Sequence, residues 1–144
     1  MNAELLREVY ALVSATPSAL LDLERYRSDD GRGCMIGLMA RNGMIGVYFD
    51  KTGAMKVKEP VEGETEWQYV ARMLGIKVSE LIDIASVRGH SLYDYGAPQL
   101  SDKDLLLYRI EHLFRDRGVD LNAGDGSFRH FMAAVEGFQK EKAR

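Results

Sequence analysis

The stretch GRGCMIGLMARNGMIG, residues 31–46, concentrates five glycines, three methionines and the only cysteine of the chain. Glycines at this spacing could form a loop whose backbone holds a phosphate, but such a loop requires a strand directly before it. The preceding residues, ERYRSDD, are polar, and no Gly-Lys-Ser/Thr follows. The pattern therefore favours a short buried helix over 34–42, in which Gly33, Gly37 and Ala40 form a stripe of small residues.

Cys34 is a candidate nucleophile, because a helix start and the neighbouring Arg32 would both lower the pKa of its thiol. A cysteine enzyme also needs a base, for which the chain offers His90, His112 and His130. However, a cysteine followed by methionine and isoleucine is typical of a small buried hydrophobe. We therefore assign no catalytic residue, and a small cysteine enzyme is kept as an alternative.

Metal and cofactor sites have little support in the sequence. DLNAGDG, residues 120–126, resembles the start of a calcium loop, but with Asp120 at the first position the glycine falls one place late. Phe131 then stands where a bidentate glutamate belongs. No two histidines are four residues apart, and one cysteine is too few for a zinc site. We expect no metal and no cofactor.

The segment RGHSLYDYGAP, residues 88–98, combines the residue types that most often dominate protein interfaces. A hydrolase triad from its serine, histidine and aspartate is disfavoured, because adjacent positions rarely give the required geometry. A second alternative is that the tyrosines pack back on the domain. We predict a partner-binding loop, and its candidate residues are Arg88, His90, Tyr93, Asp94 and Tyr95.

The acidic segment EPVEGETE, residues 59–66, is a second candidate surface. Its carboxylates at Glu62, Glu64 and Glu66 would suit a basic partner.

Residues 68–89 carry a pattern typical of a helix-turn-helix, with Ala71, Gly75 and Leu81 as the small residue, turn glycine and apolar residue. The second helix could in principle enter a DNA major groove. Its polar positions include Glu80 and Asp83, which phosphates would repel, whereas a reading helix usually presents Arg, Lys, Asn or Gln. Two packed core helices are therefore the favoured interpretation, and a DNA-binding regulator is the alternative.

Apolar periodicity and capping residues predict a mostly α (α+β) fold, in which five to six helices and one small β-hairpin form a single domain over 1–144. Gly43, Gly75, Gly89 and Gly118 mark expected helix ends. Helical patterns lie at 3–14, 17–25, 34–42, 66–74, 78–88, 101–117 and beyond 127, and the hairpin strands at 44–49 and 54–58.

Apolar periodicity also predicts the inward faces of two helices. They are Leu5, Val9, Leu12 and Val13 in the first helix, and Val78, Leu81, Ile82 and Ala85 in the helix after Gly75.

Composition narrows the function classes. The chain has 144 residues, 46% of them apolar, a formal net charge of −3 and a pI of about 5.6. This balance disfavours a protein whose main role is to bind phosphate backbones. A single cysteine, no basic segment before an early apolar block and no apolar run near 20 residues predict a cytoplasmic protein without a signal peptide or membrane span.

The stretches RYRSDDGRGCMIGLMAR and ARMLGIKVSELIDIA resemble, in order and layout, those of small phage and prophage proteins of unknown activity. Those proteins share a G-x-x-C-x-x-G-x-A stretch followed by an A-x-x-L-G-I/L helix pair. The resemblance covers roughly residues 3–95. This chain departs from the pattern in having Met39 before Ala40 and Leu38 in place of the usual tryptophan. The resemblance implies an accessory protein acting inside a bacterial cell and carries no catalytic set.

We therefore expect a non-enzymatic phage- or mobile-element-type accessory protein that binds a macromolecule, with a protein as the favoured partner, in the bacterial cytoplasm. Nucleic acid is a partner that the net charge disfavours. The sequence leaves the oligomeric state and the identity of the partner open.

Overall fold

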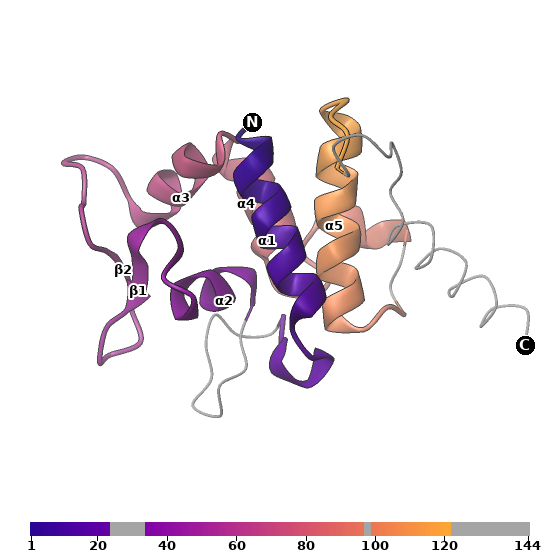
Figure 1. The fold of residues 1–144 in the computed structure, drawn as a ribbon, viewed down its shortest axis with the longest axis horizontal. Helices are drawn as coiled ribbons and strands as arrows, with labels where there is room; N and C mark the ends of the chain where they lie inside the picture. Colours follow the sequence, from indigo (N-terminus) through magenta and orange to yellow (C-terminus); the bar gives the residue numbers. More distant parts are fainter. Residues whose placement is uncertain (24–33, 97–98, 122–144) are drawn as a thin grey trace, which may run out of the picture.

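The computed structural model describes residues 1–23, 34–96 and 99–121 (Figure 1). This part of the chain is mostly helical with one small antiparallel hairpin, which confirms the predicted fold class. Its α-helices and strands are α1 (Ala3–Ala15), α2 (Met35–Arg41), β1 (Val47–Phe49), β2 (Met55–Val57), α3 (Glu66–Leu74), α4 (Val78–Ala85) and α5 (Asp102–Asp116). Three short 3₁₀ helices lie at Ser18–Leu20, Met44–Gly46 and Leu92–Gly96.

Helix α5 is the centre of the fold. Every residue from Leu105 to Glu111 is buried, so all faces of the helix over these two turns are covered by protein. Helix α1 runs beside it, and α4 also packs against it (Figure 1). The covered faces include two charged residues, Arg109 and Glu111, which must find polar partners in the interior. Tyr10 of α1 supplies one of them, because its hydroxyl donates to Glu111 Oε1 at 2.5 Å.

Helix α1 begins at a capping side chain, since Asn2 Oδ1 accepts from the backbone N–H of Leu5. Its buried stripe is Leu6, Val9 and Val13. The predicted stripe was therefore wrong in part: Leu5 and Leu12 are only half-buried at its edges. The packing of α1 against α5, α2 and α3 sets this rotation, which the periodicity alone does not determine.

The prediction of a helix over 17–25 is also wrong for residues 17–23, which the structure describes. Only Ser18–Leu20 forms a single 3₁₀ turn, and Leu21 then takes an extended conformation. Leu21 and Leu23 are buried in the core. The backbone N–H of Leu23 donates to Asp102 Oδ2 at 3.0 Å, so a tertiary contact at the start of α5 replaces the helical hydrogen bond.

The hairpin packs beside α2 at the side of the fold away from α5 (Figure 1). Its register pairs Val47 with Val57 and Phe49 with Met55. The first strand is shorter than predicted, because residues 44–46 form a 3₁₀ turn. Ile45 there has φ of +51°, an uncommon conformation for a β-branched residue. Tyr69 of α3 holds this turn by donating from its hydroxyl to the Ile45 carbonyl at 2.6 Å.

Helices α3 and α4 form the predicted pair, but α4 ends at Ala85 and not, as predicted, just before Gly89. Thr65 and Gln68 make a reciprocal capping box at the start of α3, and Gly75 ends the helix with φ of +67°. A Cβ at Gly75 would lie 2.7 Å from the backbone nitrogen of Asn2, so the turn also requires glycine for close approach. Asn2 N–H donates to the Leu74 carbonyl at 2.8 Å, which fixes the N-terminus against this turn.

The predicted inward face of α4 was wrong in part, because it included Ile82 and left out Ile84. Leu81, Ile84 and Ala85 are buried, whereas Ile82 is 46% exposed. The helix is packed by α3 and α5 along a narrow stripe, and Ile82 lies outside that stripe.

Helix α5 starts as predicted, with Ser101 Oγ accepting from Asp104 N–H, and Gly118 follows its end with φ of +64°. The helix predicted beyond Ser127 lies outside the described residues. Among the described helices, none has the length and apolar character needed to cross a bilayer.

Candidate interaction surface

The loop predicted to bind a partner follows α4 directly, and its side chains divide into two groups. His90, Leu92 and Tyr95 are exposed, with Leu92 at 70% and Tyr95 at 88%. Arg88, Tyr93 and Asp94 instead contact the body of the domain. The structure thus brings the predicted residues into one segment but gives them different roles.

Asp94 is held by a guanidinium from the centre of the fold. Arg109 of α5 is fully buried and donates to the carboxylate through two nitrogens, Nε to Oδ1 at 2.8 Å and Nη2 to Oδ2 at 2.7 Å. The backbone N–H of Gly89 donates to Asp94 Oδ2 at 2.8 Å. Burial by itself would raise the pKa of Asp94, but these hydrogen bonds and the charge of Arg109 outweigh it and hold the pKa below its ordinary value.

The same guanidinium closes the end of α4. Arg109 Nη1 donates to the Ser86 carbonyl at 2.6 Å, and Nη2 donates to the Val87 carbonyl at 3.3 Å. Carbonyls after the last helical turn have no partner within the helix, and here a buried side chain supplies one. Arg109 therefore links the end of α4 to Asp94 and fixes the loop between them.

Arg88 ties the loop to the start of α5. Its Nη2 donates to Asp102 Oδ1 at 2.6 Å and to the Leu100 carbonyl at 2.7 Å. Asp102 also accepts from Leu23 N–H, so one carboxylate joins three segments that are distant in sequence.

Tyr93 packs against the body of the domain. Its ring stacks on His112 of α5, with centroids 5.4 Å apart and an interplanar angle of 13°. Burial and the nearby carboxylates of Asp116 and Asp83 raise the pKa of Tyr93 to about 12. Burial also lowers the pKa of His112, so a neutral imidazole is favoured beside the tyrosine ring. Tyr93 therefore packs back on the domain, which is the alternative that the sequence left open for the tyrosines of this loop.

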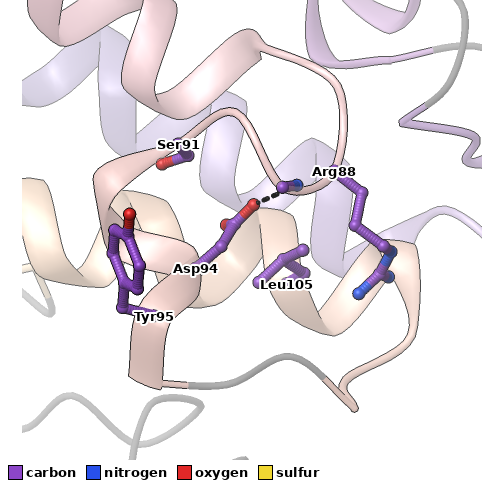
Figure 2. Close-up of a pocket in the computed structure, with 6 residues that line it drawn as sticks. Arg88, Ser91, Asp94, Tyr95 and Leu105 are labelled. Atoms are coloured by element: carbon purple, nitrogen blue, oxygen red, sulfur yellow. Dashed lines mark hydrogen bonds between the residues drawn. The ribbon is translucent and has the colours of Figure 1, made fainter.

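A cavity of roughly 360 Å³ opens between these groups. Figure 2 shows Asp94 and Leu105 between Tyr95 on one side and Arg88 on the other, with Ser91 above. Gly89 completes the lining. The cavity therefore has an apolar wall from α5, a fixed carboxylate and an exposed aromatic ring at its edge.

Two apolar side chains that the sequence interpretation did not select belong to this surface. Leu92 N–H donates to Asp83 Oδ1 of α4 at 3.3 Å, which places Leu92 beside the exposed side of that helix. Ile82 is on the same helix one residue before Asp83. Ile82, Leu92 and Tyr95 are three of the five large hydrophobic side chains that are exposed among the described residues. We call the set Ile82, Leu92 and Tyr95 the apolar patch.

The three glutamates of the predicted acidic surface have different surroundings. Glu62 is exposed, while Glu64 accepts from Arg72 of α3, with Nε to Oε2 at 2.8 Å. Glu66 is half-buried and lines a different cavity, between α3 and the hairpin. The three carboxylates therefore do not act as one charged surface.

The exposed side of α4 bears on the DNA-binding alternative. The helix has no Lys or Arg within its sequence, VSELIDIA. Glu80 accepts from Arg117 Nε at 2.8 Å and also from its Nη2, and Asp83 accepts from Leu92. What α4 presents to solvent is Ser79 and Ile82 rather than groups that read base edges.

Cys34 is buried at the start of α2, and burial raises the pKa of its thiol, which opposes thiolate chemistry. His90 is exposed on the loop, His112 stacks on Tyr93, and His130 lies outside the described residues. Across the described residues, no group of three His, Cys, Asp or Glu side chains is placed to hold a metal ion.

Comparison of the chain with protein-family models, curated proteins and solved structures gave no match. The function must therefore be inferred from the chain's own residues and their geometry.

Proposed function

We propose that this protein is a non-enzymatic binding module that docks another protein through the apolar patch and the cavity beside it. The observation that carries the proposal is the exposure of Ile82 on α4 and of Leu92 and Tyr95 on the following loop, which a buried ion pair fixes to α5. Large exposed apolar side chains gathered in one region are typical of protein interaction sites. Tyrosine is, in addition, among the residues most enriched at the energetic centres of interfaces.

Rigidity of the loop strengthens this proposal. Arg109 fixes the loop through Asp94 and two backbone carbonyls, and Arg88 fixes it through Asp102. A surface that is already ordered loses little conformational entropy when a partner binds, so more of the contact energy contributes to affinity. The adjacent cavity can receive one side chain of the partner, with Tyr95 covering it.

The chemistry of α4 favours a protein over DNA as the partner. Its exposed apolar residue and its acidic side chains would lie against phosphates if the helix entered a major groove. A net charge of −3 adds to this repulsion. DNA binding by the α3–α4 pair is therefore the competing function, and its detection would contradict the proposal.

The resemblance to small phage proteins supports an accessory role within this proposal, with the bacterial cytoplasm as its setting. A partner would then be a host or phage protein that presents an apolar side chain to Tyr95. The buried thiol of Cys34 agrees with a role that involves no catalysis.

The test is a tagged pull-down from nuclease-treated bacterial lysate, compared between the wild-type chain and a Leu92→Ser/Tyr95→Ala variant. Both side chains are largely exposed, so the variant is expected to fold, which circular dichroism checks. A stoichiometric protein that is captured by the wild type and lost from the variant supports the proposal. Tyr48→Ala is the matched control, because Tyr48 is an exposed aromatic on the hairpin and its loss should not affect capture.

Two results contradict the proposal. One is a captured partner whose recovery is unchanged in the double variant. The other is a gel shift of duplex DNA at low salt that weakens steeply as salt is added, because such behaviour reports phosphate contacts.

A further inference from the structure

A second cavity, of roughly 300 Å³, lies between the hairpin and the start of α3. It is lined by Phe49, Gly53, Ala54, Met55, Glu66 and Trp67. This cavity shares no residue with the apolar patch or with the cavity at Tyr95. Its volume falls at the lower end of the range for small-ligand sites.

The hairpin register explains one wall of this cavity. Phe49 and Met55 are directly paired, and strand alternation puts them on the same face as the buried pair Val47 and Val57. The inward apolar face of the hairpin therefore continues beyond the packed core toward the turn. Phe49 and Met55 stay half-buried there, because the cavity separates them from α3.

The first residues of α3 form the opposite wall. The Thr65 capping box fixes the start of the helix, so Glu66 and Trp67 are held at its first two positions. No hydrogen bond or ion pair engages the Glu66 carboxylate among the residues that the structure describes. Its neighbour Glu64 differs, because Arg72 already neutralises it. The cavity thus contains one available negative charge among aromatic and apolar groups.

We propose that this cavity binds a small organic cation, an alkylammonium or quaternary ammonium group. Aromatic faces attract such cations through the ring quadrupole, and tryptophan does so most strongly. Glu66 supplies the opposite charge, and Met55 with Ala54 contacts the alkyl carbons of the ligand. A phosphate or carboxylate ligand would instead meet the negative charge of Glu66 with no arginine or lysine among the lining residues.

Trp67 is the only tryptophan of the chain, so its fluorescence reports on this cavity directly. Tetramethylammonium chloride is titrated against the full-length protein, with tert-butanol as the neutral probe of similar shape and sodium chloride as the ionic-strength control. A saturable change in Trp67 emission with tetramethylammonium alone is the expected result. Equal responses to both organic probes, or no saturable response to tetramethylammonium, would overturn the proposal.

Glu66→Gln tests the role of the charge. The midpoint of the tetramethylammonium titration should rise at least about threefold, because the cation loses its carboxylate partner. Glu62→Gln removes the same charge from an exposed position outside the cavity and should leave the midpoint unchanged. An unchanged midpoint in Glu66→Gln, or equal shifts in both variants, would contradict the assignment.

Two further titrations identify where the cation comes from. Choline represents a free small molecule, and Nα-acetyl-lysine amide represents a lysine side chain of a protein. Tighter binding of one probe identifies its source, and saturable binding of neither contradicts the proposal.

Discussion

The segment after α4, residues 86–95, and the segment before α3, residues 59–65, contain no α-helix or strand, and both are rich in polar side chains. Each overlaps a segment, 88–98 or 59–66, that the sequence predicted to be a partner surface. An arginine holds each of them, but Arg109 is fully buried, whereas the side chain of Arg72 is 52% exposed. The first segment is anchored to the core by the ion pair between Arg109 and Asp94. The second segment lies on the surface beside the cap of α3.

This difference in burial decides what each ion pair contributes. Water screens an exposed pair, so its loss changes little. A buried pair is different, because the removal of one partner leaves an uncompensated charge in the interior. We therefore expect substitutions in the two segments to differ strongly in their effect on the free energy of unfolding.

The largest effect is expected for Arg109→Met. The variant leaves Asp94 without its ionic partner and leaves the Ser86 carbonyl without its donor. The free energy of unfolding should fall by about 3–5 kcal/mol, measured by urea denaturation followed by circular dichroism. Arg109→Lys keeps the positive charge but loses the two-nitrogen contact with Asp94. Its free energy of unfolding should therefore lie between those of Arg109→Met and the wild type. An unchanged urea midpoint for Arg109→Met would show that the buried ion pair contributes no more to stability than the exposed pair does.

Asp94→Asn should have the next largest effect, about 2–3 kcal/mol at neutral pH. The amide oxygen still accepts one hydrogen bond, but the charge is lost. Because the folded protein holds the pKa of Asp94 below its ordinary value, the carboxylate stabilises the fold above pH ~4 and ceases to do so as the pH falls through the folded-state pKa.

The pH dependence of this variant gives a separate check. The difference in unfolding free energy between wild type and Asp94→Asn should be constant from about pH 5 to pH 8 and should narrow below about pH 4. A difference that widens in acid would show that the pKa of Asp94 is raised rather than lowered.

Thr65→Ala should lower the free energy of unfolding moderately, and it tests how much the helix cap beside the second segment contributes to stability. The change removes the hydroxyl that accepts from Gln68 N–H, which should lower the unfolding free energy by about 1 kcal/mol. Thr65→Ser keeps the hydroxyl and should behave like the wild type in thermal unfolding. If both variants lose the same stability, the capping bond is not the cause.

Glu64→Gln should have the smallest effect, with a urea midpoint that cannot be distinguished from that of the wild type. The carboxylate pairs with an arginine that is half exposed to water. A loss of stability comparable with that of Asp94→Asn would remove the contrast between the exposed and buried pairs.

Much of the helical framework could be predicted from short stretches. Thr65 and Ser101 mark helix starts, and Gly75 and Gly118 mark helix ends, because caps and left-handed glycines act within a few residues. The segment after Pro17 could not be predicted in the same way. Its leucines are buried and its backbone bonds to Asp102, so a contact across the fold overrides a local helical pattern.

The candidate surface was only partly predictable for the same reason. The sequence selected Tyr95 and His90, which are exposed, together with Arg88 and Asp94, whose charges are used to hold the loop. Ile82 was missed, because an apolar residue in a helical pattern is normally assigned to the core. Leu92 lies in the predicted loop, where only the tyrosine, histidine and charged residues were selected. No local signal distinguishes the exposed Ile82 from the buried Ile84 two residues away.

The amino-acid sequence alone was therefore enough to predict the helix boundaries at Thr65, Gly75, Ser101 and Gly118, the hairpin and the mostly helical class. Local hydrogen bonds and backbone conformations decide these features, and both depend on neighbouring residues. Packing between distant segments determines which charged side chains are buried and which apolar side chains stay exposed. Those outcomes depend on how α5 packs against α1 and α4, because a side chain is buried only when another part of the chain covers it.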